Sequence, residues 1–190
     1  MTTDAAPCIA YPAISQIPVD LLVLKKRSPA RDDLTLTDLY GNPVFRVDSR
    51  STESTPRCRV LLDARGDPLI TVHYNDGVWQ GYRGADGECK NFLLFRVERT
   101  FYSPKLTELL VFLVGENRVD SKPDFKVKGC PFKRSCTIYK GNSIVAETSL
   151  LYKLRKIIVG RRKFRLTIFP GTIHHDLIIA LLVIFFDGRK

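Results

Sequence analysis

"GTIHHDLIIALLVIFFDGRK", residues 171–190, contains ten consecutive apolar residues at positions 177–186. A helix that spans the hydrocarbon core of a bilayer needs roughly 20 apolar residues, so this run is too short for a membrane anchor. Extending it back to Ile173 would place two histidines and Asp176 in lipid, which is unfavourable. The run has no polar stripe, and a helix that is apolar on every side must be surrounded by protein. The sequence therefore predicts a segment buried inside a domain.

The residues that flank this run favour a helix, although a short apolar run by itself fits a buried strand equally well. The Pro-Gly pair at residues 170–171 ends the preceding strand, Thr172 or Asp176 is available as an N-terminal cap, and Gly188 follows the last apolar turn. We therefore expect a buried C-terminal helix over residues 173–186.

Two stretches earlier in the chain share a pattern that predicts hairpin tips. They are DLYGNPVFRV at residues 38–47 and DARGDPLITV at residues 63–72, and a weaker third copy, YKGNSIVAET, begins at Tyr139. In each copy glycine can take a positive φ, Asn or Asp can bond its own backbone, and proline stops helix propagation in the first two. Strands are expected around the first two tips, at residues 34–36, 44–47, 60–62 and 69–72.

Alternation of apolar and polar residues continues in NFLLFRVERTFY, LLVFLVG, DFKVKG, CTIYKG, IVAETSLLYKL and RKFRLTIFP. Short strands at regular intervals, with no long amphipathic helix before residue 172, indicate an antiparallel, mainly β architecture. A sheet of this length hides its edges most simply by closing into a barrel. The sequence therefore predicts a closed antiparallel β-barrel whose interior is filled by the apolar C-terminal segment.

The size and composition of the chain fit a single globular domain. It has 190 residues, of which 44% are hydrophobic. We expect residues 1–18, which contain three prolines, to be a flexible arm before a single ordered domain over residues 19–190. No basic start followed by an apolar block marks a signal peptide, which predicts an intracellular, cytoplasmic protein. The odd number of cysteines and the lack of a Cys-x-x-Cys motif predict reduced thiols. They are Cys8, Cys58, Cys89, Cys130 and Cys136.

The residues that most resemble a metal site are His174 and His175, followed by Asp176. Adjacent side chains point in different directions and chelate poorly, and His73 has no sequence link to them. GYRGADG at residues 81–87 lacks the Lys-Ser/Thr of a phosphate-binding loop and is expected to connect strands. No nucleophile triad and no catalytic carboxylate pair is apparent. We therefore expect no enzyme activity, no cofactor and no metal.

Positive charge is concentrated in one segment. The net charge is +10, and residues 126–165 contain twelve basic residues and the single acid Glu147, so the rest of the chain is close to neutral. Strand alternation sends the basic side chains outward, and if their strands are neighbours they form one positive surface. The candidate anion-binding residues are Lys126, Lys128, Lys153, Arg155, Lys156, Arg161, Arg162, Lys163 and Arg165.

This basic strand face fits several partners. Anionic phospholipid headgroups at a membrane surface are the favoured partner, because clustered Lys and Arg side chains are attracted to an anionic leaflet. Nucleic acid is an alternative, although few aromatic residues point outward to stack on bases and no reading helix is apparent. A protein-interaction scaffold is a third, and a face that only keeps the protein soluble explains the same pattern. The chain is expected to be a monomer.

An ordered set of short motifs resembles the plant LURP-one-related family between residues 17 and 187. The set comprises PVDLL with the following Lys25-Lys26, LTDLYGNPVFRV, RVLLDARGDPLITV, Trp79 with GYRG, DFKVKG, RSCTIYKGNSIVAE and the apolar end LLVIFFD. The resemblance implies the Tubby C-terminal-like fold, in which a β-barrel of about twelve strands encloses a hydrophobic C-terminal helix.

The same resemblance implies a relationship to phospholipid scramblases and to Tubby-like membrane-tethered transcription factors. It therefore implies tethering at a membrane surface or a nuclear pool, and a role in plant defence. The phosphoinositide-contacting residues of Tubby proteins have no match in this chain, and no scramblase-like calcium loop is visible. The resemblance therefore carries over a fold and no binding residues.

Overall fold

The structure is a computed structural model of the 190-residue chain. It describes residues 17–27, 32–50, 57–84, 92–103, 105–115, 122–151, 163–171 and 174–187, apart from the side chains of residues 26, 27, 32 and 33. Most of the predicted N-terminal arm, residues 1–16, lies outside this set.

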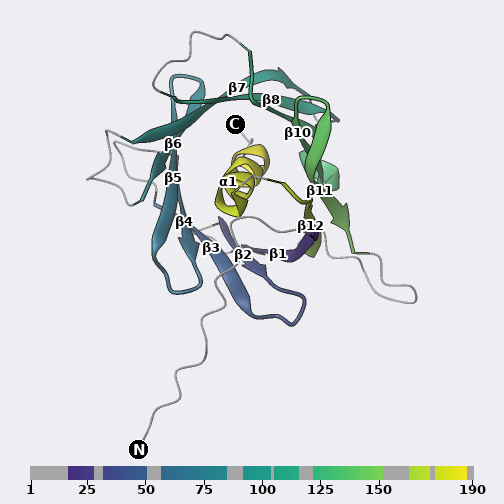
Figure 1. Ribbon diagram of the computed structural model, residues 1–190. Coiled ribbons are helices and arrows are strands. Elements are labelled where there is room, and N and C mark those ends of the chain that lie inside the picture. The colour runs from purple at the N-terminus through teal and green to yellow at the C-terminus, as the bar shows by residue number, and fades with distance from the viewer. Residues whose placement is uncertain are drawn as a thin grey trace, which may run out of the picture.

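The described residues form one closed barrel of strands around one α-helix, as Figure 1 shows. The strands are β1 (Val19–Arg27), β2 (Asp32–Thr37), β3 (Pro43–Ser49), β4 (Cys58–Asp63), β5 (Pro68–Asn75), β6 (Val78–Arg83), β7 (Leu93–Tyr102), β8 (Thr107–Leu113), β9 (Phe125–Cys130), β10 (Ser135–Lys140), β11 (Ser143–Leu150) and β12 (Lys163–Ile168). A short 3₁₀ turn, η1 (Pro131–Lys133), joins β9 to β10. The helix is α1 (His175–Phe186).

Every strand pairs antiparallel with its sequence neighbours, and the first strand pairs with the last to close the barrel. In β1 the pairing with β12 runs from Val19 opposite Ile168 to Leu24 opposite Lys163, and the other edge of β1 pairs with β2. Closure leaves none of the described strands with an unpaired edge, which removes a template for edge-to-edge aggregation. The predicted mainly β, closed antiparallel barrel is confirmed.

The first two tips fold alike because an aspartate opens each of them. Asp38 Oδ1 accepts the backbone N–H groups of Tyr40 and Asn42 at 2.9 and 2.8 Å. Asp63 Oδ1 accepts those of the residues two and four positions later, both at 2.8 Å. The glycines take φ of 95° and 94°, a region that favours glycine. The hairpin prediction is confirmed, but the side chain that accepts the backbone N–H groups is the first Asp of the motif, and the residue after glycine contributes its backbone N–H.

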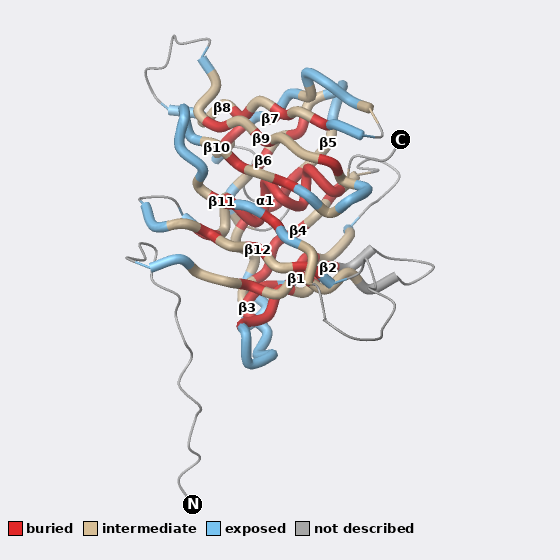
Figure 2. The backbone as a smooth tube through the Cα atoms, turned by 90° about the vertical axis from the view of Figure 1, so that its right-hand side faces the viewer, coloured by how far each residue is buried: buried red, intermediate tan, exposed pale blue. Residues whose placement is uncertain are grey.

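Alternate residues of the strands face a dry interior that α1 fills. In β12 the residues Phe164, Leu166 and Ile168 are buried, as the alternation predicted. Every helix residue from Ile178 to the last, Phe186, is also buried. A barrel of this many strands is wide enough to need filling, and the apolar helix supplies the filling. Figure 2 shows α1 as a buried segment enclosed by the strands. No helix in the described part of the chain is long and apolar enough to cross a membrane.

The helix begins slightly later than predicted. Residues 172–173 lie outside the described set, and the N-terminal cap position is His174, whose side chain makes no capping hydrogen bond. The prediction that Thr172 or Asp176 caps the helix is therefore wrong. Asp176 nevertheless lies in the first turn, where its Oδ1 accepts the Leu177 N–H at 2.9 Å and its charge suits the positive end of the helix dipole.

One glycine in the wall is needed for packing rather than for a turn. Gly81 in β6 is paired with Phe95 in β7, and a Cβ atom at Gly81 would lie 2.2 Å from the Phe95 ring. The fully buried ring therefore occupies the place of the missing side chain. The predicted connection GYRGADG is thus wrong in its first part, because Gly81 to Arg83 belong to β6. Its end, residues 85–87, lies outside the described residues.

Candidate functional site

The structure describes four of the nine candidate anion-binding residues. Lys126 and Lys128 lie in β9 and Lys163 and Arg165 in β12, and the residues between them are buried, so the cations project outward as predicted. The other five lie outside the described residues: Lys153, Arg155, Lys156, Arg161 and Arg162.

These two strands are not neighbours, so the condition for one continuous positive strand face is not met. The barrel order places β10 and β11 between β9 and β12. The acid Glu147 is exposed on β11, where it is paired with Thr137 of β10 and Thr167 of β12. The described cations therefore form two separate pairs with an acidic side chain on a strand between them.

Glu108 of β8 neutralises the first pair. Its Oε1 lies 3.5 Å from Lys126 Nζ and its Oε2 lies 3.1 Å from Lys128 Nζ. Partial burial raises the pKa of Glu108, but the hydrogen bonds and charges of the two lysines outweigh that effect and hold the pKa below its ordinary value. The carboxylate is thus ionised at neutral pH and removes part of the positive charge of β9.

Arg165 also has an acidic partner. Its Nη1 lies 3.6 Å from Asp20 Oδ2 of β1, and Asp20 Oδ1 accepts a hydrogen bond from Thr167. Neither Asp20 nor Glu108 belongs to the basic segment, so counting charge along residues 126–165 missed both. Only the register of β1 with β12 and of β8 with β9 reveals the pairs.

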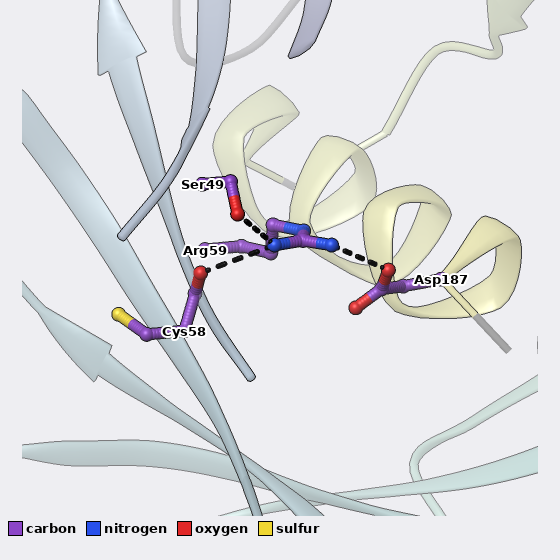
Figure 3. A network of polar contacts seen from close by, with 4 residues as sticks. All are labelled: Ser49, Cys58, Arg59 and Asp187. Carbon is purple, nitrogen blue, oxygen red and sulfur yellow. Dashed lines mark hydrogen bonds and ion pairs between the residues drawn. The ribbon is translucent and has the colours of Figure 1, made fainter. Parts of the chain in front are cut away.

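A polar cluster fixes the C-terminal end of α1 to the wall (Figure 3). Arg59 of β4 donates from Nη2 to Asp187 Oδ1 at 2.7 Å, and from Nη1 to Ser49 Oγ and to the Cys58 carbonyl. Asp187 directly follows the helix, and its N–H donates to the Val183 carbonyl at 2.9 Å. The guanidinium also offsets the negative end of the helix dipole. We call this cluster the Arg59–Asp187 latch, and the barrel end that holds it the latch end.

Cations collect at the latch end. Arg134 follows η1 and places its guanidinium 5.2 Å from the ring centre of Phe186, the last residue of α1. Other described cations toward this end lie in the nearer halves of strands or in the turns between them: Lys25, Arg57, Arg59, Arg99, Lys105, Lys133 and Lys163. Acids lie at both ends: Asp38, Asp63, Asp67, Asp124 and Asp176 at the opposite end, and Asp48, Asp76, Glu98, Glu108 and Asp187 toward the latch end.

The model of the LURP-one-related family matches residues 19–187. The chain belongs to the LURP-one-related family. The match begins at the first residue of β1 and ends at Asp187 of the latch, so it covers the whole barrel and its helix.

Curated relatives from Arabidopsis thaliana match along nearly the whole chain. LURP-one-related 7 is 42% identical over 92% of this chain and 92% of its own length. LURP-one-related 15 is 33% identical over 100% of this chain and 86% of its own length. An X-ray structure of an Arabidopsis thaliana protein superposes with a TM-score of 0.69 and 31% identity, covering 94% of this chain and 95% of that one.

The histidines of this LURP-one-related chain do not gather. His174 is exposed at the helix cap, His175 is buried in the first turn, and His73 of β5 packs edge-on against Tyr82. Among the described residues, no three His, Cys, Asp or Glu side chains are placed to hold a metal ion.

The described cysteines, Cys58, Cys130 and Cys136, are buried and free of disulfides. Burial raises the pKa of the Cys136 thiol, so it stays protonated and is a poor nucleophile.

The burial of His175 predicts a pH dependence of stability. Burial lowers the pKa of His175 below its ordinary 6.5, which the charge of Asp176 opposes in part. As the pH falls toward and below 6.5, the unfolded chain therefore binds the proton more readily than the folded chain, so stability decreases in that range. We expect the loss of stability between pH 7 and pH 5, measured by urea unfolding, to be smaller in His175→Gln. The exchange His174→Gln, at the exposed neighbour, should leave it unchanged, and equal slopes in all three proteins would contradict this assignment.

Proposed function

We propose that this LURP-one-related protein is a non-enzymatic, monomeric, intracellular module that binds anionic phospholipid headgroups reversibly through cations at the latch end. The observation that supports this most directly is the position of Arg134. The Arg134 carbonyl accepts a hydrogen bond from Thr148 Oγ1 at 2.8 Å. Thr148 Oγ1 in turn accepts a hydrogen bond from the Cys136 N–H. These bonds hold the turn with Lys133 and Arg134 against the end of β11, where residues 152–162 begin.

The proposed binding surface is centred on the η1 turn and on the cations between β11 and Lys163, and less on the cations of β9 and on Arg165. Lys126, Lys128 and Arg165 have acidic partners, so they contribute less net field than their number suggests. Lys163 is exposed at the start of β12, and no described acidic side chain forms an ion pair with it. The sequence between β11 and Lys163 adds five more cations and no acid. We infer that these cations, with those of the η1 turn, provide most of the attraction for a membrane.

The alternative partner, nucleic acid, is less well supported. A reading helix must enter a groove, whereas α1, which is the only α-helix among the described residues, is enclosed by the barrel. Outward aromatic residues are also few on β9 to β12, which leaves little surface for stacking on bases. The experiment below therefore also measures binding to duplex DNA.

Reversing four cations of the basic segment should abolish binding to anionic vesicles. The variant carries Lys153→Glu, Arg155→Glu, Arg162→Glu and Lys163→Glu. Each cation near an anionic leaflet contributes about 1 kcal/mol, so removing four weakens binding by roughly 1,000-fold, and reversal weakens it further. Co-sedimentation with phosphatidylcholine vesicles that contain phosphatidylserine or a phosphoinositide measures the change.

A control of equal charge separates this surface from net charge. It reverses four exposed cations outside the basic segment, with Arg46→Glu, Arg83→Glu, Arg96→Glu and Lys122→Glu. We expect it to keep most of the vesicle binding. Equal loss in both variants would show that only overall charge matters, and unchanged sedimentation of the first variant would refute the proposal. Tighter binding to duplex DNA than to vesicles at the same salt concentration would favour nucleic acid.

A further inference from the structure

Two neighbouring turns at the latch end expose large apolar side chains. The first joins β7 to β8 and the second, η1, joins β9 to β10; because β8 pairs with β9, the turns are two strand spacings, or about 10 Å, apart. Four apolar residues there have large exposed fractions: Phe132 64%, Phe101 50%, Tyr102 49% and Leu106 43%. Scattered exposed apolar residues need no explanation, but a cluster on adjacent turns marks an interaction site.

Hydrogen bonds fix both turns in the conformation that displays these side chains. In the first turn, the Ser103 N–H donates to the Leu106 carbonyl at 2.7 Å, and Ser103 Oγ accepts the Leu106 N–H at 3.0 Å. In the second turn, Pro131 restricts the first position and its carbonyl accepts the Arg134 N–H at 3.3 Å. Little conformational entropy is therefore lost when the displayed residues bind.

Cations surround the apolar residues. Arg99 lies 5.1 Å from the ring centre of Tyr102, Lys105 precedes Leu106, and Lys133 and Arg134 follow Phe132. Glu108, the nearby acid paired with Phe101 across β7 and β8, is already bound by the two lysines of β9. Apolar and aromatic side chains with cations beside them match the interface of an anionic bilayer, where apolar groups enter between headgroups and cations contact phosphates.

We propose that the described segments Phe101–Ser103, Lys105–Leu106 and Pro131–Arg134 insert Phe132, Leu106 and the neighbouring aromatic residues into the interface of an anionic bilayer. This inference rests on the proposed lipid binding and adds a direction to it: the latch end faces the membrane and the opposite barrel end faces away. Binding then has an apolar component that salt does not screen, in addition to the electrostatic attraction of the basic segment.

The test introduces tryptophan at two equally exposed phenylalanines on opposite ends of the barrel. Phe132→Trp probes the latch end, and Phe92→Trp, at a residue with 62% exposure just before β7, is the matched control. The native Trp79 is buried, and its signal in the wild-type chain is subtracted. With phosphatidylcholine–phosphatidylserine vesicles that carry brominated acyl chains, we expect quenching and a blue shift for Trp at 132 and neither change for Trp at 92.

A second pair of variants measures the contribution of the apolar residues. Leu106→Ser with Phe132→Ser should weaken vesicle binding by about ten-fold or more, because two apolar side chains no longer leave water. Phe92→Ser with Val114→Ser removes two exposed apolar residues from the opposite end and should have little effect. At high salt the wild-type chain should keep some vesicle binding through its apolar residues. This binding should be lost in Leu106→Ser with Phe132→Ser and kept in Phe92→Ser with Val114→Ser.

The outcomes distinguish this inference from the function on which it rests. Vesicle binding without quenching at position 132, or with equal quenching at 92 and 132, overturns the inserted orientation and leaves headgroup binding in place. No binding of the wild-type chain to anionic vesicles overturns both. Self-association of the wild-type chain without lipid, lost in Leu106→Ser with Phe132→Ser, would identify a second copy as the occupant of these turns and overturn the inference.

Discussion

Replacing Phe185 by alanine is expected to lower the free energy of unfolding by about 3–5 kcal/mol, because the fully buried ring lies in the centre of the barrel and leaves a cavity. Its edge contacts Phe186, with ring centres 5.2 Å apart, and Phe186 in turn packs against Phe164 of the wall. The loss is a large part of the roughly 5–15 kcal/mol by which a domain is stable. Urea unfolding monitored by the fluorescence of Trp79 measures it.

Leu177 offers a control on the same helix. It is only partly buried, so Leu177→Ala is expected to lower the free energy of unfolding by less than half as much as Phe185→Ala. Because alanine favours helix at both positions, a difference between the two variants reports the packing inside the barrel. Equal small effects would mean that the helix does not fill the core in solution.

Removing the whole helix should have a larger effect on stability than any single substitution in it. Nine consecutive residues, from Ile178 to Phe186, are buried, and each large apolar side chain contributes about 1.5–3 kcal/mol on burial. Together they exceed the typical net stability of a domain, so a chain that ends at Phe169 should show no cooperative thermal transition. A folded, monomeric and cooperative protein of that length would refute the barrel core described above.

The second large effect concerns the Arg59–Asp187 latch. Arg59→Ala or Asp187→Ala should each lower the free energy of unfolding by about 2–4 kcal/mol, because each leaves a poorly hydrated charge without its partner. The two side chains keep only 13% and 17% of their exposure, so solvent screens them little. The double alanine variant should be less destabilised than the sum of the single variants, and urea unfolding of all four proteins completes the cycle.

The pair Asp20–Arg165 is the matched control. Its atoms are 3.6 Å apart and its side chains are 29% and 43% exposed. Exposed ion pairs contribute about 0–1 kcal/mol, so the same cycle on Asp20 and Arg165 should give a small coupling energy. Additive effects at Arg59 and Asp187 would show that the latch does not act as a pair.

Local patterns in the sequence were sufficient to predict the barrel and its filling. The repeated Asp-x-x-Gly tips are local, because Asp38 and Asp63 bond N–H groups within four residues. The burial of α1 follows from its composition, since a helix without a polar face has to be enclosed. The family resemblance added the number of strands.

The charge surface was predicted less well because it depends on contacts between distant segments. Glu108 and Asp20 neutralise cations of β9 and β12 through strand pairings that no local pattern specifies. The latch has the same origin, since Arg59 and Asp187 are far apart in sequence and meet only when the helix enters the barrel. The start of the helix was misplaced because capping preferences favoured Thr172, before the observed cap, or Asp176, after it, whereas the cap is His174.

The position of the helix after all the strands has a consequence for biosynthesis. Ribosomes deliver a chain from its N-terminus, so the strands emerge before the segment that they must enclose. Until then their inward apolar faces have nothing to pack against, and β1 cannot yet pair with β12. We therefore expect the nascent chain to remain a substrate for chaperones until its last strand and helix have been translated, and to reach its final form in a single late step.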